Sequence, residues 1–244
     1  MEDKIAVVTP YYKESPEMLW KAHESVKAQG PGVFHIMIAD GHPDPEVATW
    51  DVQHVMLPRS HGDNGNTPRG IGGILAQAQH CNYVAYLDAD NWFFPDHINS
   101  LVDLQKTTGY HISASLRHFY AWDGTFMTNV SEYDENEHRH VDTSCILVHQ
   151  SGFSALSIWT QIPKPLSPIC DRIFCAWLRQ NRFAIAHSNQ RTVAFRSQYE
   201  GHYHAAGLTP PQNCKTTIMD APVKWLFSAD GIRETVNRLG FFPM

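Results

Sequence analysis

The sequence lacks the patterns that mark several common protein classes. Its five cysteines are scattered and form no Cys-x-x-Cys pair, so neither a disulfide framework nor a zinc ribbon is expected. An odd, dispersed set is typical of reduced, mostly buried thiols in a cytosolic protein. The His-Glu-x-x-His pattern is also missing, which argues against a zinc hydrolase.

Long apolar runs and an excess of positive charge are missing too. No apolar stretch approaches the roughly 18 residues that a membrane span needs. The formal net charge is −6 and the arginines are dispersed, so nucleic acid is not an expected partner. The first residues lead directly into a strand-like segment, so we expect no signal peptide. The expected location is cytoplasmic, with peripheral attachment to the inner face of the membrane as an alternative.

What the chain does contain is an alternation of apolar runs and helical segments. Strands are predicted at residues 5–8, 34–39, 52–57, 83–87 and 111–116, and helices at residues 16–28, 67–79 and 95–106. This order is typical of an α/β fold with a mostly parallel sheet flanked by helices. Near residue 117 the rhythm changes to short antiparallel strands and irregular segments, which we interpret as a change of role within one fold.

The strongest functional signal follows the fourth predicted strand. The apolar run at residues 83–87 ends in two carboxylates, Asp88 and Asp90, separated by one residue. The carboxyl edge of an open α/β sheet is where ligands bind. Hard oxygen donors at this edge suit Mg²⁺ or Mn²⁺, which proteins usually hold with one or two carboxylates plus substrate phosphates. The pattern therefore predicts a metal–diphosphate site.

Polar residues also follow the neighbouring strands. The first strand ends near Thr9 and Tyr11, and the second ends in Asp40. In a parallel sheet these ends share one edge with Asp88 and Asp90. The set suits a nucleotide, with an aromatic ring for the base, a carboxylate for a ring N–H and a metal for the phosphates. Asp40 alone is equally well explained as a turn residue before a glycine.

The remaining polar candidates each have an ordinary structural explanation as well. Arg69 begins a helix, where a guanidinium makes an anion site, although a solvated surface arginine fits equally well. Asp171 opens another helix and is either a helix cap or a general base. His202 and His204 alternate, so in a strand both imidazoles would face one metal, and a surface pair without a ligand is an equal alternative. Asp142 is interpreted as a satisfied polar residue.

Taken in order, these motifs resemble those of family 2 glycosyltransferases of the GT-A fold. The matching segments are Val7–Tyr12, Ile38–Gly41, Gly65–Ile71 and Tyr86–Asp90, which cover about the first half of the chain. The resemblance implies a single GT-A-type domain over residues 1–244. Residues 1–116 would form its nucleotide-sugar-binding half and residues 117–244 a smaller, antiparallel acceptor-side half.

The resemblance also implies roles for individual residues. The residues expected to bind the nucleotide-sugar are Thr9, Tyr11, Asp40, Arg69, Asp88 and Ala89. Asp90 is expected to bind Mn²⁺ or Mg²⁺, with His202 or His204 as a further ligand. Asp171 falls where the family has its catalytic base, although Cys170 stands where a glutamate often precedes that base.

The implied reaction is transfer of a hexose from a nucleotide-sugar, expected to be a UDP-sugar, to a hydroxyl acceptor with inversion. The acceptor would be a glycan, a lipid-linked group or another hydroxyl compound. The aromatic residues that would stack on a sugar ring, unless they belong to the core, are Phe119, Tyr120, Trp122, Trp159 and Trp177.

Two other functions remain open from the sequence. A nucleotidyltransferase that makes nucleotide-sugars would want a Gly-rich basic loop after the first strand, where this chain has Thr9-Pro10-Tyr11-Tyr12-Lys13. A catalytically inactive nucleotide- or glycan-binding module of the same fold would explain the incomplete pattern at Cys170.

Overall fold

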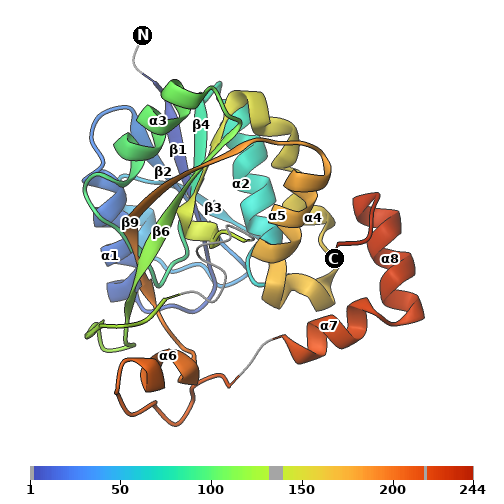
Figure 1. The fold of residues 1–244 in the computed structure, drawn as a ribbon. Coiled ribbons are helices and arrows are strands. Elements are labelled where there is room, and N and C mark those ends of the chain that lie inside the picture. The colour runs from blue at the N-terminus through green and yellow to red at the C-terminus, as the bar shows by residue number, and fades with distance from the viewer. Residues whose placement is uncertain (1–2, 132–139, 217–218, 244) are drawn as a thin grey trace.

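One nine-stranded sheet runs through the structure, a computed structural model that describes residues 3–131, 140–216 and 219–243. The strand order is β3-β2-β1-β4-β8-β6-β9-β5, with β7 paired to β6. Figure 1 labels six of these strands, β1, β2, β3, β4, β6 and β9. The strands are β1 (Ile5–Tyr11), β2 (Val33–Ala39), β3 (Gln53–Met56), β4 (Tyr83–Tyr86), β5 (Trp92–Phe93), β6 (Ile112–Tyr120), β7 (Phe126–Met127), β8 (Ile146–His149) and β9 (Ile185–Arg196).

Most of these strands run in one direction. β1 pairs in parallel with β2 and β4, and β2 pairs in parallel with β3. β8 is antiparallel to both β4 and β6, so β6 points the same way as β4, and β9 lies parallel to β6. The short strands β5 and β7 are antiparallel to their neighbours. The predicted α/β class with a mostly parallel sheet is confirmed, and the change of role expected near residue 117 falls within β6.

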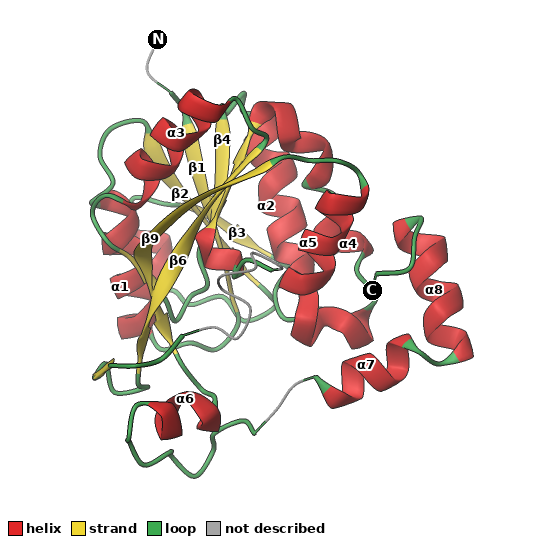
Figure 2. Cartoon of the chain, in the orientation of Figure 1, coloured by secondary structure: helices red, strands yellow, loops and turns green. Residues whose placement is uncertain are grey.

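Helices cover both faces of the sheet. They are α1 (Pro16–Lys27), α2 (Asn66–Ala78), α3 (His97–Thr108), α4 (Ile158–Gln161), α5 (Cys170–Gln180), α6 (Glu200–Ala205), α7 (Asp220–Leu226) and α8 (Ala229–Leu239). In Figure 2, α1 and α3 lie on one side and α2, α4 and α5 on the other. The Gln29 side chain ties the first pair together, because its amide donates to the Phe94 carbonyl and its oxygen accepts from the Ile98 N–H, both at 3.0 Å.

Short 3₁₀ turns also occur in the described chain, and one of them, η3, supports the edge of the sheet at which the parallel strands end. They are η1 (Val47–Thr49), η3 (Thr143–Cys145), η4 (Gln150–Ala155) and η5 (Lys164–Ile169).

Capping residues set several helix ends. The Ser15 hydroxyl accepts a hydrogen bond from the Met18 N–H at 3.3 Å, and Pro16 occupies the first helical position, as the sequence predicts. Near the C-terminal end of the described chain, α7 and α8 are separate helices, because Ser228 caps α8 by accepting from the Gly231 N–H at 3.0 Å. Among the described helices, none combines the length and apolar character needed to cross a membrane.

Helix α2 packs very closely against β1 because a glycine faces the strand. A Cβ atom on Gly72 would lie 2.4 Å from a methyl group of Val8 and 3.0 Å from one of Ile38. Both of these neighbours are fully buried in the core. The close approach matters for function because α2 carries Arg69 one turn earlier.

We predict that Gly72→Ala lowers the free energy of unfolding by about 1–3 kcal/mol, the usual effect of overpacking a core. Urea denaturation measures it. Gly201→Ala is the matched control, since Gly201 lies in α6 and a Cβ atom there would meet no neighbouring atom within 4 Å. Equal stability of the two variants would contradict the packing argument.

His97, at the start of α3, is a buried neutral histidine. Its Nδ1 lies 2.8 Å from the Thr192 hydroxyl, and its ring stacks on Phe93 with the centroids 4.0 Å apart. Burial lowers the pKa of His97 from 6.5 to about 3. Below pH 6.5 the unfolded chain therefore binds a proton that the folded chain does not, and stability is lost as the pH falls from 6.5 toward 3.

We predict that His97→Gln reduces the pH dependence of the unfolding free energy between pH 4.5 and 6 by about 1.4 kcal/mol per pH unit, the effect of one proton. The slope is the readout, because the substitution also lowers stability at every pH. His42→Gln, at an exposed histidine, should leave the slope unchanged. An unchanged slope in His97→Gln would show that this histidine is protonated in the folded protein.

Candidate functional site

The carboxyl ends of the parallel strands line one cavity of about 470 Å³, here called the main cavity. Its lining includes Pro10, Tyr11, Asp40, Arg69, Asp88, Ala89 and Asp90. The residues at the ends of these strands therefore meet in one cavity, as the sequence predicts. The loop at residues 60–65 closes the cavity on the side of β2.

Thr9 is the exception in the predicted nucleotide-sugar-binding set. Its side chain is fully buried, and its hydroxyl lies 2.8 Å from His35 Nε2. His35 in turn contacts His23, with 3.1 Å between the two Nδ1 atoms. Thr9 and Tyr11 lie on the same face of β1, and Thr9 is two residues further from the end of the strand. Thr9 therefore lies beneath the main cavity and is not among the residues that line it. A side-chain contact between Thr9 and a nucleotide does not fit this geometry.

Tyr11 and Asp40 lie at the cavity wall, each held by neighbours. The Tyr11 hydroxyl is 2.6 Å from His54 Nε2 and accepts from the Asp44 N–H at 3.0 Å. The Asp40 carboxylate lies 2.7 Å from His61 Nδ1 and accepts from the His61 N–H at 3.0 Å. The Ser60 hydroxyl donates to it at 3.1 Å. Both side chains therefore have defined orientations.

Gly41 makes the contact to Asp40 possible. It has φ +81°, and a Cβ there would lie 2.2 Å from the Ser60 nitrogen. The chain at residues 59–61 therefore crosses directly over Gly41. Ser60 and His61 are absent from the sequence-based set, because no pattern in the chain links them to a residue on the other side of β3.

Arg69 and Asp88 form an ion pair of 2.5 Å. The Arg69 guanidinium also donates to the Asn64 carbonyl at 2.7 Å and lies 5.5 Å from the Trp159 ring centroid. Burial by itself lowers the pKa of Arg69, but the neighbouring Asp88 carboxylate outweighs it and raises that pKa above its ordinary value. The positive charge predicted at the start of α2 is present, and Asp88 already compensates it.

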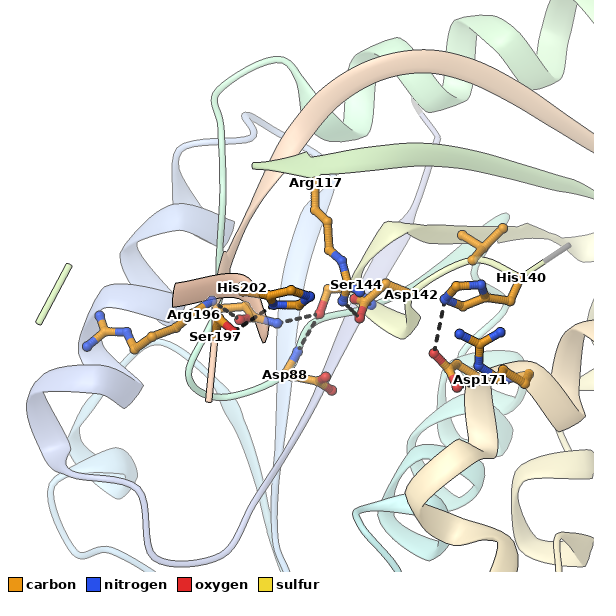
Figure 3. A network of polar contacts seen from close by, with 12 residues as sticks. Asp88, Arg117, His140, Asp142, Ser144, Asp171, Arg196, Ser197 and His202 are labelled. Atoms are coloured by element: carbon orange, nitrogen blue, oxygen red, sulfur yellow. Dashed lines mark hydrogen bonds and ion pairs between the residues drawn. The ribbon is translucent and has the colours of Figure 1, made fainter. Parts of the chain in front are cut away.

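The Asp88–Asn91 loop is held from the second half of the chain. The Ser144 hydroxyl, in η3, accepts from the Asp88 N–H and from the Asn91 amide, both at 3.1 Å (Figure 3). Asp142 caps η3 by accepting from the Ser144 N–H at 2.9 Å and forms an ion pair with Arg117 of β6. The interpretation of Asp142 as a satisfied polar residue agrees with these contacts, and its supporting position was not evident from the sequence.

Asp90 has the least compensated charge in the main cavity. Its nearest polar side-chain contact is a long one, 3.5 Å from the Gln198 amide. Burial, followed by the negative charges of Asp88 and Glu14, raises the pKa of Asp90 to about 7. Glu14 also lines the cavity and was missed by the sequence reasoning. A cation bound here would relieve this repulsion.

Asp171 lines a second cavity of about 290 Å³ that shares Asn64, Arg69 and Asp88 with the main cavity. This junction brings Asp171 to the neighbourhood of Asp88. The Asp171 carboxylate accepts from the Arg172 N–H at 2.7 Å, and His140 Nε2 lies 4.0 Å away (Figure 3).

The prediction that His202 and His204 alternate in a strand is wrong. They lie in α6, where residues two apart point about 200° away from each other. His202 faces the second cavity, with Nδ1 2.8 Å from the Ser197 hydroxyl, and burial followed by the charge of Arg117 lowers its pKa to about 4. His204 is exposed and lies 3.1 Å from Glu200. This geometry does not support a metal ligand role for His204.

A metal in the main cavity would rely on few protein ligands. Among the residues that the structure describes, no group of three or more His, Cys, Asp or Glu is arranged to hold an ion. Asp90, with the free oxygen of Asp88, supplies hard carboxylate donors. That set fits Mg²⁺ or Mn²⁺ when phosphates and water complete the coordination.

The aromatic residues considered for sugar stacking divide into core and surface. Trp159 and Phe119 are buried, and Trp159 stacks on Phe174. Trp122 is 39% exposed and is the most accessible of the set. Trp159 and Phe119 therefore belong to the core and are not available to stack on a sugar ring.

Comparison with known proteins shows to which family the chain belongs. The family described as Glycosyl transferase family 2 matches residues 6–161. Succinoglycan biosynthesis protein ExoW of Rhizobium meliloti (strain 1021) is 31% identical over 104 residues, covering 39% of this chain. The match spans only 32% of ExoW, about a third of that protein's length.

Solved structures of S. aureus TarS share the fold across the chain. TarS 1–349 in complex with UDP superposes with a TM-score of 0.60 at 12% identity, over 97% of this chain and 70% of that one. The complex with UDP-GlcNAc gives a TM-score of 0.59 at 10% identity, over 96% and 72%. The mixed α/β sheet is thus that of GT-A glycosyltransferases. Because the family match covers more than half of the sequence, the chain belongs to glycosyl transferase family 2.

Proposed function

We propose that this chain is a metal-dependent glycosyltransferase that moves a hexose from a UDP-sugar to a hydroxyl acceptor with inversion. The observation that carries the proposal is the junction of two cavities at Arg69 and Asp88. One cavity is lined by the polar residues at the ends of the parallel strands, which suit a nucleotide. The other contains Asp171, which is positioned to act as a base.

The nucleoside would occupy the part of the main cavity near β1 and β2. Asp40 offers carboxylate oxygens for a ring N–H, and Tyr11 offers an aromatic wall. The TarS structures, which have the same fold, are complexes with UDP and UDP-GlcNAc, and this supports a uridine nucleotide.

The charges of the main cavity support a divalent cation. Its lining carries the carboxylates of Glu14, Asp40, Asp88 and Asp90, against the one guanidinium of Arg69, which is already ion-paired. A diphosphate entering such a cavity would be repelled. A cation held by Asp90 and Asp88 would neutralise the negative charge that develops on the departing nucleoside diphosphate.

Asp171 would take the proton from the acceptor hydroxyl. The hydroxyl oxygen would then form its bond to the anomeric carbon while the bond from that carbon to the diphosphate oxygen breaks, releasing UDP. A single displacement from the side opposite the leaving group inverts the anomeric centre. The His140 imidazole, 4.0 Å from Asp171, is positioned to stabilise the carboxylate.

Cys170 favours the second candidate, an inactive binding module of the same fold. It stands before Asp171 where the family often has a glutamate, and burial raises the pKa of its thiol to about 12. A neutral thiol does not replace a carboxylate. Transfer activity therefore rests on Asp171 alone.

We predict that Asp90→Asn weakens binding of UDP in the presence of Mn²⁺ by about tenfold or more, because a charged contact to the ion is lost. Isothermal titration calorimetry measures it. His204→Ala, at the exposed histidine of α6, should bind as tightly as the parent protein. Unchanged affinity in Asp90→Asn, or equal binding with and without EDTA, would contradict the assigned metal site.

We predict that Asp171→Asn slows release of UDP from UDP-hexoses by about 10²–10⁴-fold, the usual contribution of a general base, while UDP binding is kept. UDP release from UDP-glucose, UDP-galactose and UDP-GlcNAc is followed by a coupled assay, with Asp230→Asn on the exposed face of α8 as the control. If the parent protein binds UDP with Mn²⁺ but releases no UDP from any donor, the inactive module is the correct function.

A further inference from the structure

A third cavity lies near the end of β6, separate from both cavities of the site. It measures about 290 Å³ and is lined by Trp122, Gln198, Tyr203, Pro211, Asn213 and Cys214, with Ser197 at its edge. We call it the Trp122 pocket. Within the part of the chain that the structure describes, no side chain that lines it carries a charge at neutral pH.

The tryptophan in this pocket is exposed but firmly held. Its side chain is 39% exposed, whereas Tyr203 below it is buried. The Trp122 N–H donates to the Tyr203 hydroxyl at 2.8 Å, and the Arg196 guanidinium donates to the Trp122 carbonyl at 2.9 Å. These two bonds hold the Trp122 backbone, and the Arg196 guanidinium lies 5.8 Å from the centroid of the ring. A ring held in this way loses little conformational entropy when a ligand stacks on it.

The polar groups around the ring suit a saccharide. Gln198 and Asn213 are primary amides, which offer both donors and acceptors to neighbouring hydroxyl groups. A pyranose ring has C–H groups on its faces and hydroxyls at its edge, so an indole face and flanking amides match both. The volume of about 290 Å³ lies just below the usual range for ligand pockets, roughly 300–1,000 Å³, and so suits one ring.

The Trp122 pocket adjoins the reaction site through residues 196–198. The Gln198 amide lies 3.5 Å from the Asp90 carboxylate. The Arg196 N–H donates to the Asn91 side chain at 2.9 Å. A sugar ring bound in the Trp122 pocket would therefore be separated from Asp90 by the Gln198 side chain.

The position of Asp171 indicates which sugar ring of an acceptor would occupy the Trp122 pocket. Arg196 and Asp171 lie at opposite ends of the polar network, with Asp88 between them (Figure 3). An acceptor hydroxyl beside Asp171 therefore belongs to a different ring from the one on Trp122. An acceptor that reaches both places contains more than one sugar.

We propose that the Trp122 pocket is a distal subsite for a neutral pyranose ring of an oligosaccharide acceptor. The proposal rests on the proposed function and narrows the acceptor class to a glycan. The experiment measures binding of neutral tetrasaccharides of β-1,3-, β-1,4- and β-1,6-linked glucose and galactose in the presence of UDP and Mn²⁺. Saturation-transfer difference NMR detects contacts, and titration gives the affinities.

At least one tetrasaccharide should bind the parent protein more tightly than the disaccharide of the same linkage. In Trp122→Ala the affinity for that tetrasaccharide, taken relative to the affinity for UDP, should fall at least tenfold. Trp122→Phe, which keeps an aromatic face, should give an intermediate loss. Trp20→Ala is the matched control, because Trp20 on α1 is 43% exposed and lies outside the pocket. The same UDP titration shows whether each variant is folded.

The outcomes separate this proposal from the proposed function. If the protein binds UDP with Mn²⁺ but none of the saccharides, or if Trp122→Ala binds them as well as Trp20→Ala does, the subsite is excluded and the donor assignment stands. If the parent protein does not bind UDP with Mn²⁺, the proposed function itself fails.

Discussion

The ion pair between the buried Arg69 and the partly exposed Asp88 is the contact on which the site depends. It joins α2 to the loop after β4, and both of its members line both cavities. Removing Asp88 would leave the buried Arg69 guanidinium uncompensated, which is destabilising. Ser144 reaches the same loop from the second half of the chain. The junction where donor and acceptor would meet is therefore held from both halves of the sequence.

Asp90 has the opposite character. Two residues from Asp88, it gains no compensating cation from the described residues that line its cavity other than the paired Arg69, and Glu14 adds a further negative charge. A carboxylate whose pKa is raised to about 7 is destabilising in its ionised form. Such local conflicts are typical of ligand sites. Here the unfavourable feature is the negative charge at Asp90, which a divalent cation bound together with a diphosphate would compensate.

The first-half elements could be predicted from the sequence because each is encoded locally. Buried parallel strands appear as short apolar runs, and the residues after them must lie at one edge of the sheet. Tyr11, Asp40 and Asp88 were found in this way. His61 and Ser60 were not, because their contact with Asp40 depends on how the chain crosses Gly41 after β3. Thr9 was misplaced because the pattern does not show how far beneath the edge a side chain lies.

The α/β class, the succession of the first strands along the chain and the two carboxylates at the end of β4 could be predicted from the sequence alone, since these depend on periodicity and on neighbours in the chain. The folded structure was needed to show that His202 and His204 point apart, because residues two apart face the same way in a strand but point apart in a helix. It also decided that Asp171 adjoins Asp88 and that Gln198 lies between Asp90 and Trp122. Those contacts join segments distant in the sequence, and packing alone sets them.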